Sequence, residues 1–157
     1  MDGRRIWGWY FFDWASQPYS TLLVTFIFGP YIAEVLGDGS QAQAAWGFGI
    51  EAAGIVLAIL APVLGALADT GGSRMRWITL FSALYVVASG ALWFATPDNF
   101  NLVLTLIFFC LGLIAMEFAT IFTNSMLPDL TTRDRIGRVS GNGWAFGYLG
   151  GLVSLVI

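Results

Sequence analysis

The sequence has 157 residues, of which 57% are hydrophobic and only 11% are charged, and its mean hydropathy is +0.75. Soluble domains usually carry about 25% charged residues, so this composition excludes an ordinary soluble domain. The net charge is −3, there is no histidine, and the one cysteine is Cys110. These counts exclude a basic nucleic-acid-binding protein, an intramolecular disulfide and any histidine-based metal or catalytic site. We expect that the protein has no cofactor and is not an enzyme.

Five apolar stretches are long enough for membrane-spanning helices, each of which needs about 20 residues. The predicted helices cover residues 6–36, 42–68, 75–95, 101–127 and 135–157. Ser40 and Gln43 have the spacing of a capping box for the second helix, and Thr131 or Thr132 is the predicted cap of the fifth. The sequence therefore predicts an all-α membrane protein with about five transmembrane helices, surrounded by the lipid bilayer.

All seven positive charges are arginines, and they lie in alternate connections. They precede or begin the first, third and fifth predicted helices: Arg4, Arg5, Arg74, Arg76, Arg133, Arg135 and Arg138. The connections around residues 37–41 and 96–100 contain none. Because arginine-rich connections stay on the cytoplasmic side, we expect a multi-pass protein of the inner (plasma) membrane with a cytoplasmic N-terminus.

Two acidic residues lie well inside predicted membrane helices. Asp13 is about 12 Å of helix beyond the N-terminal arginines, and Glu117 is about 16 Å of helix before the end of the fourth apolar stretch. Charged side chains in a membrane are costly, so a proton or substrate path is favoured over a structural hydrogen bond. Gln17 and Tyr19 follow Asp13 and are expected to line the same cavity, or else to bond neighbouring helices.

Glycines mark two helix faces. Gly143, Gly147 and Gly151 recur every four residues on the fifth predicted helix, and small residues at this spacing let helices approach closely. A helix-packing surface is the favoured interpretation. The second predicted helix carries a similar set of small residues, namely Gly47, Gly54, Ala58 and Gly65.

Residues 65–76 connect the second and third predicted helices and read Gly-Ala-Leu-Ala-Asp-Thr-Gly-Gly-Ser-Arg-Met-Arg. This segment resembles the signature loop of the major facilitator superfamily, where a glycine, an aspartate, a second glycine and basic residues recur. The resemblance implies a cytoplasmic gate formed by Gly65, Asp69, Gly72 and Arg74. Thr70 and Ser73 stand where basic residues are common, so the gate has fewer positive charges here.

Residues 12–19 read Phe-Asp-Trp-Ala-Ser-Gln-Pro-Tyr and resemble the opening-helix signature of the vacuole-effluxer-like branch of that superfamily. That branch is related to autophagy-linked amino-acid effluxers. Residues 127–130, 138–141 and 143–151 resemble its loop and fifth helix. The resemblance implies a secondary active transporter that moves a small solute, with amino acids as candidates, by alternating access coupled to a proton or another ion.

Transporters of this superfamily have two six-helix halves, so the sequence matches five helices of the first half. It ends at Ile157 within an apolar stretch, and we expect that the sixth helix and the second half are missing. The missing half, or another membrane chain, is then the expected partner. The alternatives are a small structural membrane protein that self-associates through the glycine face of its fifth helix, or a non-functional truncated product.

Overall fold

The computed structural model describes residues 3–70 and 74–157, without the side chains of residues 68–70. This part of the chain is helical and has no strand. The elements in chain order are α1 (Gly3–Pro18), η1 (Tyr19–Ile27), α2 (Phe28–Leu36), α3 (Gly39–Thr70), α4 (Arg74–Ala91), η2 (Leu92–Phe94), η3 (Pro97–Asn99), α5 (Leu102–Asn124), α6 (Leu127–Leu130) and α7 (Ile136–Ser154).

Four helical segments of the described chain are long and apolar enough to cross a membrane. They are Gly3–Leu36, Gly39–Leu67, Arg74–Phe94 and Leu102–Asn124. Many large apolar side chains on these segments are exposed, which suits contact with lipid because no water-soluble fold leaves so much apolar surface uncovered. The protein is an all-α membrane protein, as the composition predicts.

The fifth predicted span forms the helix α7 but is not among these four segments. The physical reason is composition: α7 contains six glycines, and it also carries Arg138 and Asn142, so its apolar content is low. Glycine contributes almost nothing to hydropathy while it allows close helix contact. A membrane-spanning role for α7 therefore stays a prediction.

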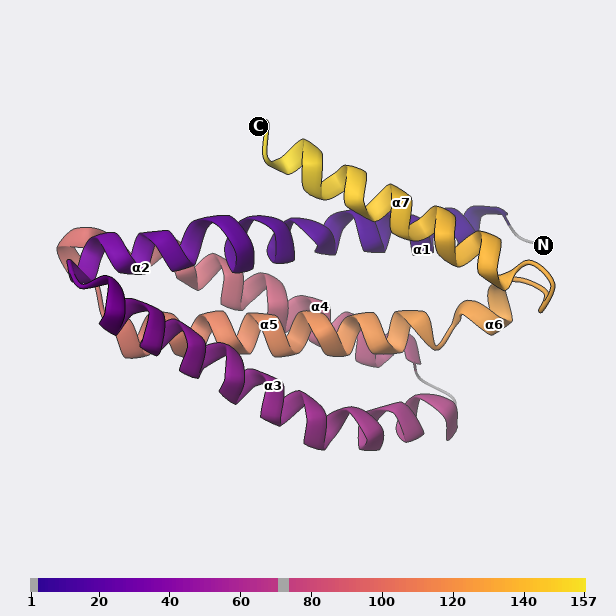
Figure 1. Ribbon diagram of the computed structural model, residues 1–157. Coiled ribbons are helices and arrows are strands. Elements are labelled where there is room, and N and C mark those ends of the chain that lie inside the picture. The colour runs from indigo at the N-terminus through magenta and orange to yellow at the C-terminus, as the bar shows by residue number, and fades with distance from the viewer. Residues whose placement is uncertain (1–2, 71–73) are drawn as a thin grey trace. The chain divides into compact units, whose positions relative to one another are not determined.

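The chain divides into two compact units. Unit 1 consists of Met1–Ile27 and Thr123–Ile157, and unit 2 is Phe28–Phe122. In unit 1, α7 packs along α1, and both helices run in the same direction (Figure 1). Parallel packing means that both helices start at the same end of unit 1.

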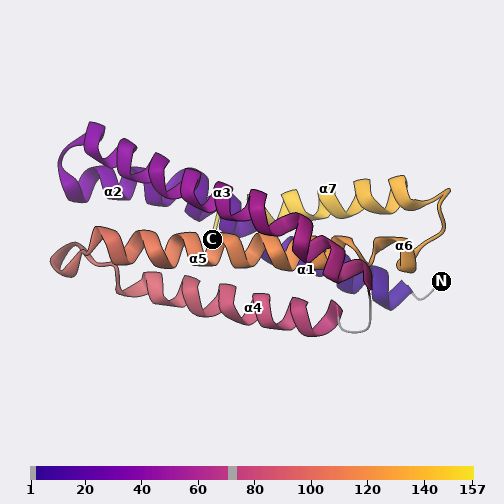
Figure 2. The same cartoon turned by 90° about the horizontal axis from the view of Figure 1, so that it is seen from below.

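Helix α5 is the centre of unit 2, where it runs between α3 and α4 (Figure 2). Near its start, the buried ring of Phe109 lies 5.8 Å from Phe28 of α2 and 4.4 Å from Trp46 of α3, measured between centroids. Near its end, the buried ring of Phe122 stacks on Trp77 of α4 at 5.7 Å. Aromatic contacts from three helices therefore hold α5 along most of its length.

The first membrane helix changes its hydrogen-bonding pattern after Pro18. Proline has no N–H to donate, which interrupts the α-helical ladder at this position. The chain continues as a π-helix over Tyr19–Ile27. The hydroxyl of Thr25 donates to the carbonyl of Ser20, five residues earlier, at 2.8 Å, which fits the wider turn. Most π-helical segments are single turns at functional sites, so nine residues make η1 unusual.

The N-terminal cap of α3 is Asp38, so the predicted capping box at Ser40 is wrong. The Asp38 carboxylate accepts hydrogen bonds from the backbone N–H groups of Ser40 and Gln41 at 2.9 and 3.2 Å, and from the Ser40 hydroxyl at 2.7 Å. The hydroxyl bond and the backbone bonds hold the pKa of Asp38 below its ordinary value. Gly37, at φ +66°, ends the preceding helix in a conformation that glycine adopts without strain.

Helix α7 has no side-chain cap, so the predicted cap at Thr131 or Thr132 is also wrong. Thr131 is buried, and its hydroxyl has no hydrogen-bond partner among the described residues. The backbone carbonyl of Thr132 accepts hydrogen bonds from the N–H groups of Arg135 and Ile136. The Thr132 side chain is hydrogen-bonded to the Asp134 carboxylate, and this bond is the largest cause of the lowered pKa of Asp134. The Thr132 side chain is therefore engaged with the loop instead of the helix.

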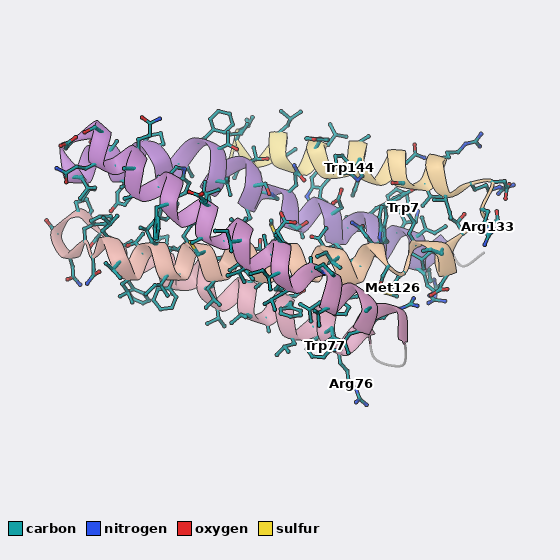
Figure 3. All side chains as sticks on the ribbon, turned by 60° about the horizontal axis from the view of Figure 1, so that its bottom comes forward. Trp7, Arg76, Trp77, Met126, Arg133 and Trp144 are labelled. Atoms are coloured by element: carbon teal, nitrogen blue, oxygen red, sulfur yellow. The ribbon has the colours of Figure 1, made fainter. Side chains whose placement is uncertain are left out.

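The arginines lie at one end within each unit. Figure 3 shows Trp7 of α1 and Arg133, just before α7, at the same end of unit 1. In unit 2, α2 contacts the arginine-free connection that precedes α5, because the Tyr31 hydroxyl donates to the Ala95 carbonyl and its ring lies 5.8 Å from Phe100. Arg74 begins α4 at the other end. This arrangement agrees with the alternation of charges, while the side of the membrane that each end faces stays a prediction.

Candidate functional site

The contact between α1 and α7 in unit 1 joins residues that the sequence singled out separately. A Cβ added at Gly143 would overlap the ring of Trp9, and a Cβ added at Gly147 would overlap the Asp13 carboxylate. Trp9 and Asp13 are four residues apart on α1, and Gly143 and Gly147 are four residues apart on α7, so the two parallel helices stay in register. The predicted glycine face of the fifth helix thus packs on the face of α1 that carries Asp13.

The contact continues one turn further. A Cβ on Gly151 would lie 2.5 Å from the Thr21 hydroxyl oxygen and 3.1 Å from Cγ of Gln17. Both polar side chains therefore lie directly against the α7 backbone. The face that would serve self-association of the isolated chain is already covered by α1 within unit 1.

Gly150 makes the tightest backbone contact of α7. A Cβ there would lie 2.7 Å from the backbone carbonyl oxygen of Trp14. Because Pro18 has no N–H, this carbonyl lacks the usual acceptor role toward the residue four positions later. It instead sits against α7, where only glycine leaves enough room.

Trp9 anchors the start of this contact. Its ring is 6% exposed, and its Nε1–H donates to the backbone carbonyl of Thr123 at 3.2 Å. Phe146 of α7 lies nearby in a group of aromatic rings, with centroids 4.7 Å from Trp14 and 5.8 Å from Trp7. No sequence motif points to Trp9, although its position four residues before Asp13 places it on the same helix face.

Four polar residues repeat every four positions along the first membrane helix: Asp13, Gln17, Thr21 and Thr25. Four residues overshoot one turn of an α-helix, which has 3.6 residues per turn, so such a series drifts around the helix. In a π-helix the turn is wider and four residues fall short of it, so the drift reverses. The change at Tyr19 therefore keeps the later threonines close to the face that Gln17 occupies.

These side chains line a pocket between η1 and α7 in unit 1, which we call the η1–α7 pocket. Its volume is about 360 Å³, and its lining residues are Gln17, Ser20, Thr21, Thr25, Phe26, Tyr148, Leu152 and Leu155. Tyr19 is not among them, because its side chain is only 2% exposed and points into the packed interior. Gln17 therefore lines the η1–α7 pocket without Tyr19, and a cavity shared by these two residues stays a prediction.

The two membrane-embedded acids belong to different units. Asp13 lies on α1 in unit 1, and Glu117 lies on α5 in unit 2 between the buried side chains of Met116 and Phe118. Both acids are half-buried. In residues 3–67 and 74–157, no hydrogen bond or ion pair engages either carboxylate. A path shared by these two residues stays a prediction.

The predicted gate is described only in part. Gly65 lies within α3, and a Cβ there would meet no heavy atom of the described chain within 4 Å, so its role in packing stays a prediction. Gly72 and the side chain of Asp69 lie outside the described residues. Arg74 is the first residue of α4 and is half-buried.

A different glycine of α3 makes the close helix contact. A Cβ on Gly49 would lie 3.1 Å from Leu106 of α5, and the Gly49 carbonyl accepts a hydrogen bond from the Cys110 thiol at 3.2 Å. Gly47 and Gly54 meet open space among the described residues. The glycines of α3 that the sequence pattern selected therefore form an uncovered face of unit 2.

No group of three or more histidine, cysteine, aspartate or glutamate side chains in the described part of the chain could hold a metal ion. The chemistry available at the α1–α7 contact is therefore that of one carboxylate, one amide and several hydroxyl groups. Such groups bind and orient small polar molecules or carry a proton, and no nucleophile is paired with a base there.

Comparison with known proteins identifies the family. The family described as "Vacuole effluxer Atg22 like" matches residues 48–137, more than half of the chain. A protein of Bacillus subtilis (strain 168) named "Uncharacterized MFS-type transporter YxiO" is 28% identical over 153 residues, which cover 95% of this chain and 35% of that protein. An "Uncharacterized protein" of Aquifex aeolicus (strain VF5) is 38% identical over 99 residues, 62% of this chain and 24% of that protein.

No solved structure matches the chain at a significant level. The chain spans about a third or less of the length of the two relatives. The matched region includes α4 and α5 and most of α3, while the relative from Bacillus subtilis also extends over the α1–α7 contact. The chain belongs to the vacuole effluxer Atg22-like family.

Proposed function

We propose that this chain is the N-terminal part of a secondary active transporter that moves a small solute across the cytoplasmic membrane by alternating access. Amino acids are candidate solutes, and a proton or another ion is the candidate coupling partner. The family, the relative named as a transporter of the major facilitator type, and the four apolar helices support this proposal. Such transporters place their solute sites between helices near the middle of the membrane.

The observation that carries the proposal is the position of Asp13. Its carboxylate lies against the backbone of α7 at Gly147, within a membrane helix, and no described residue forms an ion pair or hydrogen bond with it. A carboxylate at such a position is costly, and acids inside membrane helices commonly mark a solute or proton path. Gln17 and Thr21 continue the polar face toward the η1–α7 pocket. Glu117 is proposed as a second acid of the path.

The remaining helices of the transporter are proposed to be the sixth helix of the first half and the six helices of a C-terminal half. Its closure against the cytoplasmic end would engage Asp69 and Arg74 of the proposed gate, with Gly65 and Gly72 allowing the chain to turn. Reading the genomic sequence after the codon for Ile157 tests this directly. Seven further apolar segments in frame, or after one frameshift, are expected, and an immediate stop followed by unrelated sequence would refute it.

Self-association is the second candidate function, and the structure favours a different surface for it. The glycine face of α7 is covered by α1, whereas Gly47 and Gly54 of α3 have open space around them. Small residues on an uncovered face of a membrane helix allow a second helix to approach. Under this alternative, crosslinking between copies should occur through α3 and not through α7.

The decisive experiment measures uptake of a mixture of radiolabelled amino acids into vesicles that contain the full-length transporter, that is, this chain together with the sixth helix and the C-terminal half, under an imposed pH gradient. The test variant is Asp13→Asn, which removes one carboxylate charge and keeps its size. The matched control is Asp38→Asn, which removes the same charge from a capping residue outside the membrane helices. We expect uptake to be lost with the first variant and kept with the second. Uptake that is equal in both variants would refute a role for Asp13 in the path.

A further inference from the structure

The lining of the η1–α7 pocket combines apolar surface with several hydrogen-bonding side chains. Five of its residues carry hydrogen-bonding side chains: Gln17, Ser20, Thr21, Thr25 and Tyr148. None of the described residues that line it is charged. Most of the exposed lining is apolar, as in most small-molecule sites, and these polar groups are few. Polar groups that face hydrocarbon without partners are costly, so these groups call for an occupant that can form hydrogen bonds.

Several of these hydrogen-bonding groups are available to an occupant. In the described part of the chain, the amide of Gln17 and the hydroxyls of Thr21 and Tyr148 make no hydrogen bond. The Thr25 hydroxyl uses its hydrogen for the Ser20 carbonyl, which leaves its oxygen as an acceptor. Gln17, Thr21 and Thr25 offer donors and acceptors from the first membrane helix, while α7 contributes the Tyr148 hydroxyl beside the apolar side chain of Leu152.

The charge distribution narrows the kind of solute. The acid of the polar face, Asp13, lies against Gly147 and is not among the residues that line the pocket. No arginine lines it either. A net charge placed in the pocket would lose hydration without gaining a counter-charge, which is far more costly than the loss of hydration by a neutral polar molecule. The pocket volume of about 360 Å³ falls within the range of small-molecule sites, roughly 300–1,000 Å³.

We propose that the η1–α7 pocket is a binding site for a small hydrogen-bonding solute without net charge, held between the π-helical segment of the first membrane helix and α7. The proposal rests on the transport function proposed above and specifies where in unit 1 the solute binds and which charge state it has. The π-helix is the structural basis, because it brings Thr21 and Thr25 to the face of Gln17. Two other occupants, a lipid chain and another membrane helix, are outcomes that the test distinguishes.

The test uses thiol-reactive probes on the whole chain in lipid vesicles. The background variant is Cys110→Ala, which removes the one native thiol. Thr21→Cys places a thiol on the pocket wall, with Thr25→Cys as a second pocket variant. The matched control is Ile27→Cys, because this exposed apolar residue belongs to η1 and does not line the pocket. The probes are three water-soluble methanethiosulfonates that carry a neutral hydroxyethyl group, a quaternary ammonium group or a sulfonate group.

If the pocket holds water-soluble neutral molecules, the hydroxyethyl probe should react with Thr21→Cys at least about tenfold faster than with Ile27→Cys, because lipid keeps polar reagents away. Both charged probes should react with Thr21→Cys about tenfold or more slowly than the hydroxyethyl probe does, after each rate is divided by the rate of the same probe with a thiol in water. Thr25→Cys should show the same order.

Equal or slower labelling of both pocket variants compared with the control would mean that lipid or a helix fills the pocket, and would overturn the proposal. Preference for a charged probe would overturn the assigned charge state. These results are independent of transport, because labelling does not require a moving solute. Failure of the proposed function instead appears as uptake that does not depend on Asp13.

Discussion

Gly150 offers the sharpest test of the α1–α7 contact. In a Gly150→Ala variant the new methyl group would lie 2.7 Å from the backbone carbonyl oxygen of Trp14. A side chain could rotate away from such a contact, but a backbone carbonyl within a helix cannot. The two helices must therefore separate by about 0.7 Å to reach 3.4 Å, where contacts with a Cβ become ordinary.

The expected magnitude follows from a matched pair of variants on the same helix. Gly141→Ala adds the same methyl group where no described atom lies within 4 Å. Both variants gain the helix propensity of alanine over glycine, roughly 0.5–1 kcal/mol. Only Gly150→Ala adds the cost of overpacking, typically about 1–3 kcal/mol. The difference between the two variants should therefore be about 1–3 kcal/mol, or roughly 5- to 150-fold in the unfolding equilibrium constant.

The assay is reversible unfolding of the chain in detergent micelles, titrated with denaturant and followed by tryptophan fluorescence. Trp14 supplies a reporter within the contact itself, so its emission should respond when α7 separates from α1. Fluorescence and circular dichroism should give the same midpoint if unit 1 unfolds cooperatively.

Two results would contradict the reasoning. If Gly150→Ala and Gly141→Ala unfold at the same denaturant concentration, α7 does not lie against the Trp14 carbonyl. If Gly141→Ala is the less stable variant, the assignment of the two faces of α7 is reversed. Gly137→Ala is a second control, because no described atom lies near that position either.

Three further predictions concern other contacts. Hydrogen bonds lower the pKa of Asp38 from its ordinary value of 3.8. The stabilising contribution of the Asp38 carboxylate should therefore be complete above pH 3.8 and should disappear as the pH falls through the lowered pKa of the folded state. Asp38→Asn keeps the cap without the charge, and it should remove this part of the acid sensitivity in unfolding curves measured from neutral to acidic pH. Gly49→Val should lower stability in thermal unfolding by about 1–3 kcal/mol through overpacking against α5, whereas Gly47→Val should be close to neutral. Trp9→Phe should lose the buried hydrogen bond to Thr123 and about 0.5–1.5 kcal/mol in denaturant titrations, and unchanged stability would show that this bond contributes nothing.

Helix caps show how local sequence rules can select the wrong neighbour. Ser40 fits a capping pattern, but Asp38 lies two residues earlier and accepts the same backbone N–H groups with a charged carboxylate. Bonds to an ionised acceptor are stronger than bonds to a hydroxyl, so the aspartate caps the helix and the serine donates to it. Two competing caps this close together are distinguished only by geometry.

The glycines of α3 show a second limit. Gly47, Gly49 and Gly54 all belong to this helix, and spacing alone favoured the first and the third as packing residues. The structure selects Gly49, because the side chains of α5 approach α3 at that turn. Spacing identifies which residues share a face, but the direction of that face depends on where the neighbouring helix lies.

The sequence by itself determined the class of protein, four of the five predicted apolar spans, the family resemblance and the two acids within long apolar helices. Each of these follows from properties that add along the chain: hydropathy over about 20 residues, charge in each connection, and short motifs. Only the tertiary structure decided that α7 packs on the face of α1 that carries Asp13, and that Gln17 lines a pocket while Tyr19 does not. The physical reason is that both facts depend on contacts between residues far apart in the sequence, such as Gly147 against Asp13 and Gly151 against Gln17, while the change of turn after Pro18 redirects only the side chains that follow it.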